Sequence, residues 1–118
     1  MTASVSLEKI TCTFASKSGE GSYTAVRDVD LAIADGEFVS VVGPTGCGKS
    51  TLLNVAAGLL KPSSGSVKIH GAPLSGINRR AGYMFQTEAL MPWRSALDNV
   101  TAGLQFRGED RDAARAKG

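Results

Sequence analysis

The chain has 118 residues, of which 42% are hydrophobic and 20% charged, and this balance is typical of a globular protein rather than a disordered one. Its length allows one domain at most, and its net charge of +2 favours no class of partner. No apolar stretch approaches the roughly 18 residues of a membrane span, and the N-terminus has no signal-peptide pattern, so the sequence predicts a cytosolic protein. Cys12 and Cys47 lack the spacing of a metal site or a disulfide framework, which predicts reduced thiols.

The N-terminal third predicts strands joined by turns. From Val5 to Phe14 apolar residues alternate, with one slip around Glu8 and Lys9 that predicts a bulged strand. The glycine- and serine-rich residues 15–24 predict a hairpin connection, and residues 29–33 alternate as a second strand. Asp35-Gly36 is a turn signal before a third strand, so we expect these three strands to form a meander.

That third predicted strand, residues 38–42, is a continuous apolar run typical of a buried parallel strand. It leads into GPTGCGKST, which matches the phosphate-binding pattern G-x-x-x-x-G-K-[ST]. The order of strand, glycine loop and helix is the context that this motif requires. The predicted nucleotide-binding residues are Gly43, Pro44, Thr45, Gly46, Cys47, Gly48, Lys49, Ser50 and Thr51.

Each residue type in the loop has a chemical reason. Glycines let backbone N–H groups approach phosphate oxygens and adopt positive φ angles. Lys49 is expected to act catalytically as a point charge on the β- and γ-phosphates, and Ser50 to ligate Mg²⁺. Cys47 lies near a helix N-terminus and Lys49, which could favour its thiolate, although a small residue that the loop tolerates is the simpler interpretation.

Downstream, helical spacing predicts a helix that starts at the loop and ends at Lys61-Pro62, followed by a short strand at residues 67–69. Residues 82–85 predict a second parallel strand that ends at Gln86. Ser95 is a predicted N-cap of a further helix, and residues 108–118 are charged and weakly helical.

Gln86 is expected to emerge at the carboxyl edge of the sheet, near the γ-phosphate. A neutral amide there can touch Mg²⁺ or orient the attacking water, so Gln86 is the second predicted catalytic residue and a predicted metal ligand. The alternative is a polar residue that merely ends a strand.

From Thr51 onward the sequence resembles the ATP-binding subunits of ABC transporters. The stretch STLLNVAAGLLKPSSGSVKIHG is similar to the segment that follows the family's Walker A motif, and YMFQTEALMPWRSALDNV is similar to its Q-loop region. Pro92-Trp93 followed by Asn99-Val100 is most like the branch that imports nitrate, sulfonates, taurine and related solutes. The resemblance extends from about Val5 to Arg107.

The resemblance implies ATP and Mg²⁺ as cofactors, Gln86 as the Q-loop glutamine and an aromatic residue stacked on adenine. Phe14 is the preferred candidate for that stacking and Tyr23 the alternative. It also implies three partners: a second ATP-binding subunit, a membrane permease contacted by residues Leu90 to Arg94, and, indirectly, a solute-binding protein. The chain itself is expected at the cytoplasmic face of the cell membrane. No nucleic-acid partner is expected.

The implied fold class is α/β: a P-loop NTPase-type nucleotide-binding domain with an N-terminal antiparallel β subdomain, truncated, over residues 1–118. Three family features cannot be assigned: the LSGGQ-type motif, an apolar strand ending in Asp-Glu, and a histidine beyond His70, itself expected at the surface. We therefore expect the first half of such a subunit, marginal stability, and little or no hydrolysis of ATP by this chain alone.

The implied function is the ATP-binding subunit that energises import of a small solute, resembling nitrate, sulfonate or taurine, through a permease. One alternative is a non-catalytic nucleotide-binding fragment. Another is a different P-loop enzyme, such as a GTPase or a kinase. The sequence has no N-K-x-D segment, which a GTPase would need, and no arginine-rich lid, which a kinase would need, although Arg79 and Arg80 are adjacent.

Overall fold

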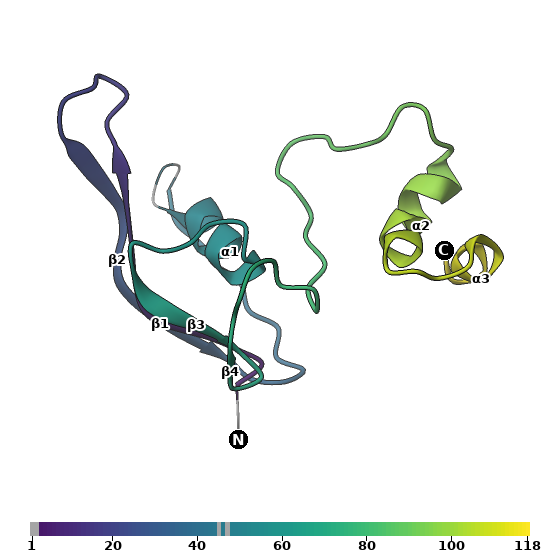
Figure 1. Cartoon of the computed structure of the whole chain (residues 1–118), viewed down its shortest axis with the longest axis horizontal. Helices are drawn as coiled ribbons and strands as arrows, with labels where there is room; N and C mark the ends of the chain where they lie inside the picture. The colour runs from purple at the N-terminus through teal and green to yellow at the C-terminus, as the bar shows by residue number, and fades with distance from the viewer. Residues whose placement is uncertain (1–2, 45, 47) are drawn as a thin grey trace. The chain divides into compact units, whose positions relative to one another are not determined.

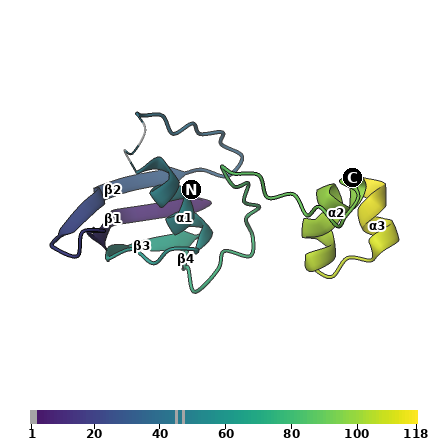
Figure 2. The same cartoon turned by 90° about the horizontal axis from the view of Figure 1, so that it is seen from above.

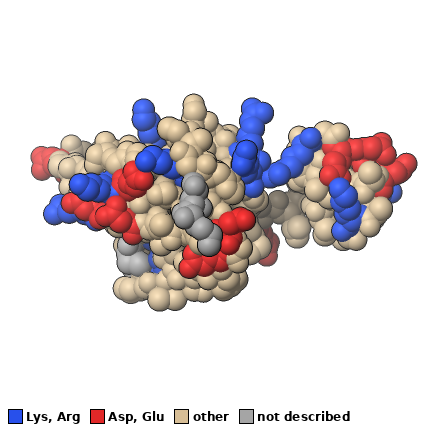
Figure 3. All heavy atoms as spheres, turned by 90° about the horizontal axis from the view of Figure 1, so that it is seen from below, with Lys and Arg blue, Asp and Glu red and all other residues tan. Residues whose placement is uncertain are grey.

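The computed structural model describes residues 3–44, 46 and 48–118, and it divides the chain into two compact units. The first unit contains a sheet and one helix and extends to Ala81, and the second begins at Gly82 and contains two helices (Figure 1). Acidic and basic side chains are mixed on the face of the chain drawn in Figure 3.

Strands β1 (Val5–Ala15) and β2 (Ser22–Ile33) form an antiparallel hairpin, as predicted, with the second strand longer than expected. The predicted bulge is confirmed, because the register shifts between Leu7 and Ile10, and Lys9 has a φ of 49°. The Lys9 N–H donates to Asp30 Oδ1 at 2.8 Å instead of joining the ladder. A side chain thus satisfies the backbone donor that the bulge displaces.

The sheet has four strands in the order β2-β1-β3-β4, and all its pairings are antiparallel. Strand β3 (Ser64–Ile69) pairs with β1, and the two-residue strand β4 (Ala72–Pro73) pairs with β3 across a turn that holds the exposed His70. The meander prediction was therefore wrong. The second neighbour of β1 is β3, which follows the first helix in the sequence. Its alternating residues Val67 and Ile69 offer β1 an apolar face.

Helix α1 (Lys49–Ala57) lies against one face of this sheet (Figure 2). Its Val55 joins four strand residues in the buried core, which consists of Leu7, Ile10, Cys12, Val26 and Val55. The helix ends before the predicted Lys61-Pro62. Gly58 adopts a left-handed conformation with a φ of 76°, and its N–H donates to the carbonyls of Asn54 and Val55, which closes the last turn.

The two predicted parallel strands do not form. Residues 37–44 follow the predicted Asp35-Gly36 turn but are neither strand nor helix, and Phe38 and Val42 are 92% and 87% exposed. Residues 82–85, in the second unit, are likewise irregular and Met84 is exposed. A parallel strand is stable only with hydrogen-bonded neighbours and covered faces, and within the described residues every strand belongs to the antiparallel sheet.

In the second unit, helix α2 (Ala96–Phe106) packs against helix α3 (Arg111–Lys117). Ser95 caps α2 as predicted, because its hydroxyl accepts a hydrogen bond from the Asp98 N–H at 3.1 Å. The residues buried between the helices are small: Thr101, Ala102 and Ala114. The weakly helical tail of the sequence is thus a formed helix, held by its packing on α2.

Candidate functional site

The glycine loop brings its backbone around the start of α1. Gly46 and Gly48 have φ angles of 82° and 95°, in the left-handed region that glycine adopts readily. Gly48 has a second constraint, because a Cβ there would lie 2.8 Å from the Ala25 carbonyl oxygen and 2.9 Å from a Val26 methyl group. The predicted site residues Thr45 and Cys47 lie outside the described residues.

The N-terminus of α1 is open toward an anion. Gly48 is its N-cap, so no side chain caps the first N–H groups, and the first turn contains no acidic residue. Unsatisfied N–H groups and the positive end of the helix dipole together attract negative charge. Lys49, Ser50 and Thr51 form this first turn, and the Ser50 side chain is exposed there.

Lys49 folds back over the loop that precedes it. Its Nζ donates hydrogen bonds to the carbonyl oxygens of Gly43 at 2.5 Å and Pro44 at 2.9 Å. The sequence-predicted residues Gly43, Pro44 and Lys49 are therefore in direct contact. The loop thus combines backbone donors with a cation, which is the chemistry that binds phosphate oxygens.

The two candidates for the adenine-stacking residue are cross-strand partners on the first hairpin. Phe14 pairs with Tyr23, and their ring centroids are 5.6 Å apart. Phe14 also packs against the apolar core, whereas Tyr23 is 56% exposed. Either ring could offer a face to a base, and the choice of Phe14 stays a prediction.

Gln86 belongs to the second unit, where it is exposed in an irregular segment rather than at the end of a strand. The sequence assigned it the roles of Mg²⁺ ligand and catalytic residue. Both roles stay predictions.

The predicted permease-contact segment is shaped by Asn99, which the sequence analysis named only as part of the family resemblance. The Asn99 side chain accepts a hydrogen bond from the Met91 N–H at 2.9 Å and donates to the carbonyls of Met91, Arg94 and Ser95. Trp93, within this loop, is 77% exposed. A sequence signal for this role was the position of Asn99 in the first turn after the Ser95 cap.

An apolar groove of about 890 Å³ lies beside this loop within the second unit. Phe85, Leu90, Met91 and Val100 contribute to its walls. The Arg94 guanidinium lies 5.3 Å from the centroid of the Phe106 ring, a cation–π contact that orients the Arg94 side chain. The loop thus presents large apolar groups on a framework of backbone hydrogen bonds.

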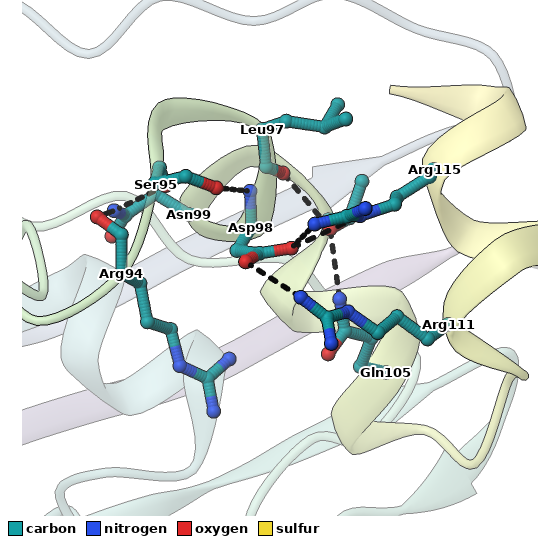
Figure 4. A network of polar contacts seen from close by, with 9 residues as sticks. Arg94, Ser95, Leu97, Asp98, Asn99, Gln105, Arg111 and Arg115 are labelled. Carbon is teal, nitrogen blue, oxygen red and sulfur yellow. Dashed lines mark hydrogen bonds and ion pairs between the residues drawn. The ribbon is translucent and has the colours of Figure 1, made fainter.

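Outside the glycine loop, Asp98 lies in a network of polar contacts (Figure 4). The Arg115 guanidinium is hydrogen-bonded to Asp98, and this contact, with Ser95 and Arg111, lowers the pKa of the Asp98 carboxyl. Lys68 likewise lowers the pKa of Glu8. Burial raises the pKa of the Cys12 thiol. In the part of the chain that is described, no cluster of acidic, histidine or cysteine residues suits a metal ion.

Within the same described part, no helix is both long and apolar enough to cross a membrane. Residues 26–117 match the family model described as ABC transporter. The taurine import ATP-binding protein TauB of Burkholderia pseudomallei strain 1710b is 40% identical over 115 residues, which cover 98% of this chain and 44% of that protein. The protein of the same name from Pseudomonas aeruginosa PAO1 is 54% identical over 83 residues, which cover 70% of this chain and 32% of that protein.

A solved structure gives the same result for the fold. The ATP-binding cassette MJ0796, in a dimeric post-hydrolysis state bound to ADP and phosphate, matches with a TM-score of 0.83 and 34% identity. That match covers 96% of this chain and 53% of the cassette chain. The chain therefore spans less than half of the first curated relative and about half of this solved cassette.

Proposed function

The chain belongs to the ABC transporter family, and we propose that it is the nucleotide-binding part of an ATP-binding subunit that energises import of a small solute. The observation that carries this proposal is the loop at the start of α1, where Lys49 contacts the Gly43 and Pro44 carbonyls beside an uncapped helix N-terminus. The relatives named as taurine import ATP-binding proteins support the direction of transport and suggest a sulfonate as the solute.

ATP fits the loop by its chemistry. The γ- and β-phosphate oxygens would accept the Lys49 hydrogen bonds that the two loop carbonyls now accept, and the backbone N–H groups of the first turn of α1 would donate to them. Ser50 offers an exposed hydroxyl oxygen for Mg²⁺. When bound, Mg²⁺ would neutralise charge on the β- and γ-phosphates.

Further site residues belong to the proposal. The base would stack on the aromatic pair, with Phe14 as the first candidate and Tyr23 as the second, since the two rings form one hydrophobic surface. Gln86 would orient water or touch Mg²⁺.

The proposed partners follow from the loop and from the relatives. A membrane permease would contact residues Leu90 to Arg94, where Trp93 and Leu90 are exposed beside the apolar groove. A second ATP-binding subunit would complete the assembly, as the solved cassette is dimeric. A solute-binding protein would act indirectly, and the subunit would work at the cytoplasmic face of the membrane.

The decisive experiment removes the lysine. We expect Lys49→Ala to abolish binding of Mg-ATP measured by titration calorimetry, because the loop would lose its only cation among residues 43–51. Lys61→Ala, an exposed lysine beyond the other end of α1, is the matched control and should bind like the unchanged chain. Equal affinity of Lys49→Ala and the unchanged chain would remove the assignment of the loop as a nucleotide site.

A further inference from the structure

The loop of residues 76–81 closes against the C-terminal end of α1. The Asn78 N–H donates to the Ala57 carbonyl at 2.9 Å. A Cβ on Gly58 would overlap the Gly76 carbonyl oxygen, so the absence of a side chain at Gly58 allows this close approach. The loop and the helix end are therefore joined backbone to backbone.

The Asn78 side chain strengthens the junction from both of its ends. Its Nδ2 donates to the Ala56 carbonyl at 3.2 Å, and its Oδ1 accepts a hydrogen bond from the Arg80 N–H at 3.1 Å. Asn78 is a polar residue that is only 8% exposed, so these hydrogen bonds offset the free-energy cost of removing its amide from water. The last carbonyls of a helix have no partner within the helix, and Asn78 supplies partners for two of them.

Helix α1 is short enough for its two ends to be coupled. It has nine residues, which corresponds to roughly 13 Å or two and a half turns. A helix of this length is marginal by itself and depends on tertiary contacts. The end held by Asn78 and the end formed by Lys49 therefore belong to one cooperative segment.

We propose that Asn78 is a positioning residue for the phosphate loop: by capping α1 from outside the helix, it holds the first turn of α1 in the orientation that binds nucleotide. This inference rests on the proposed function of the loop. Thermodynamic linkage makes the effect reciprocal, so nucleotide bound at Lys49 must stabilise the junction at Asn78.

Two substitutions separate the bonds of Asn78. Asn78→Ala removes both side-chain bonds. Asn78→Asp keeps an oxygen that accepts from the Arg80 N–H but loses the donor to Ala56, and it adds negative charge near the negative end of the helix dipole. Ile77→Ala is the matched control, since Ile77 is adjacent in the loop and 64% exposed.

The test measures the dissociation constant of a fluorescent Mg-ATP analogue for the 118-residue chain and its variants. We expect Asn78→Ala and Asn78→Asp to weaken binding by about three- to tenfold and Ile77→Ala to leave it unchanged. Wild-type affinity in both Asn78 variants would overturn the inference, while loss of binding in Lys49→Ala would still support the nucleotide site. Absence of binding by the unchanged chain would overturn both proposals.

Hydrogen exchange supplies a readout that needs no Asn78 variant and that a merely structural role would not change. Nucleotide should slow exchange of the Asn78 and Arg80 amides in the unchanged chain, and should have no such effect in Lys49→Ala. If nucleotide protects the first turn of α1 but leaves the Asn78 and Arg80 amides unaffected, the coupling is absent and the inference is wrong. This measurement decides the matter even if Asn78→Ala fails to fold.

Discussion

The two units of the chain are held together by different physical means. The first buries large apolar side chains between its sheet and α1, with Leu7, Ile10 and Val55 at most 2% exposed. The second buries only small residues, and an ion-paired network around Asp98 joins its two helices. Burial of a large apolar side chain contributes about 1.5–3 kcal/mol, whereas an ion pair at the surface contributes much less. We therefore expect the first unit to have a larger free energy of unfolding than the second.

Both units expose large apolar side chains. Phe38 and Val42 in the first unit, and Met84 and Trp93 in the second, are large and lie at the surface. The first three lie in the segments that the sequence assigned to parallel strands. A parallel sheet would bury them on both faces, and the described residues supply only the antiparallel sheet.

The largest expected effect comes from the core of the first unit. Ile10→Ala should destabilise that unit by about 2–5 kcal/mol, because Ile10 is fully buried and its loss leaves a cavity between β1 and α1. Hydrogen exchange of the β1 and β2 amides measures this change. Exchange in α2 should be unaffected if the units are independent, and equal acceleration in both units would contradict the comparison.

The phosphate loop offers the next effect. Gly48→Ala should destabilise the first unit by about 1–3 kcal/mol, since an alanine would keep a strained positive φ and would press on the Ala25 carbonyl. Gly46→Ala is the control for φ alone, because a Cβ there has no neighbour within 4 Å. Chemical denaturation measures both variants. Equal destabilisation would show that the close approach to Ala25 costs nothing.

The features that the sequence predicted correctly are local. The bulge at Glu8 and Lys9 follows from a slip in alternation, and the Ser95 cap follows from its place before an apolar helical face. Both depend on residues within a few positions of each other. The Asp35-Gly36 turn is correct for the same reason.

The features that failed depend on distant partners. The apolar run at residues 38–42 has the composition of a buried strand, but composition does not supply the neighbouring strands that make one. The place of β3 beside β1 depends on a contact between residues about 60 positions apart, such as Leu7 and Val67. The structural roles of Asn78 and Asn99 were not predicted, because each side chain bonds to backbone atoms, which no side-chain motif records.

The second unit should respond to pH through Asp98. The pKa of Asp98 is lowered, chiefly by its hydrogen bond from Arg115, so its stabilising effect is fully present above its ordinary pKa of about 4. That stabilisation is lost as the pH falls through the lowered value. Exchange of the Ala114 amide, buried on α3, should accelerate over this range.

Asp98→Asn is the control for that acid effect. The variant should weaken the contact between α2 and α3 at neutral pH and should lack the acid-dependent acceleration, because an amide does not titrate. The reporter must be local, since the pKa of Glu8 is also lowered and its loss of charge would act on the first unit. An unchanged pH profile in Asp98→Asn would mean that another group causes the acid response.

The smallest expected effect concerns the most prominent aromatic residue of the second unit. Trp93→Ala should change stability by less than about 0.5 kcal/mol, because the side chain is 77% exposed and the loop that carries it is fixed by Asn99 through backbone atoms. Asn99→Ala is the opposite case, a small side chain whose loss should free residues 91–95. Hydrogen exchange of the Met91 amide distinguishes the two variants. A larger effect from Trp93→Ala than from Asn99→Ala would mean that Trp93 stabilises the unit by packing, and would weaken the argument that its exposed ring is kept for a partner.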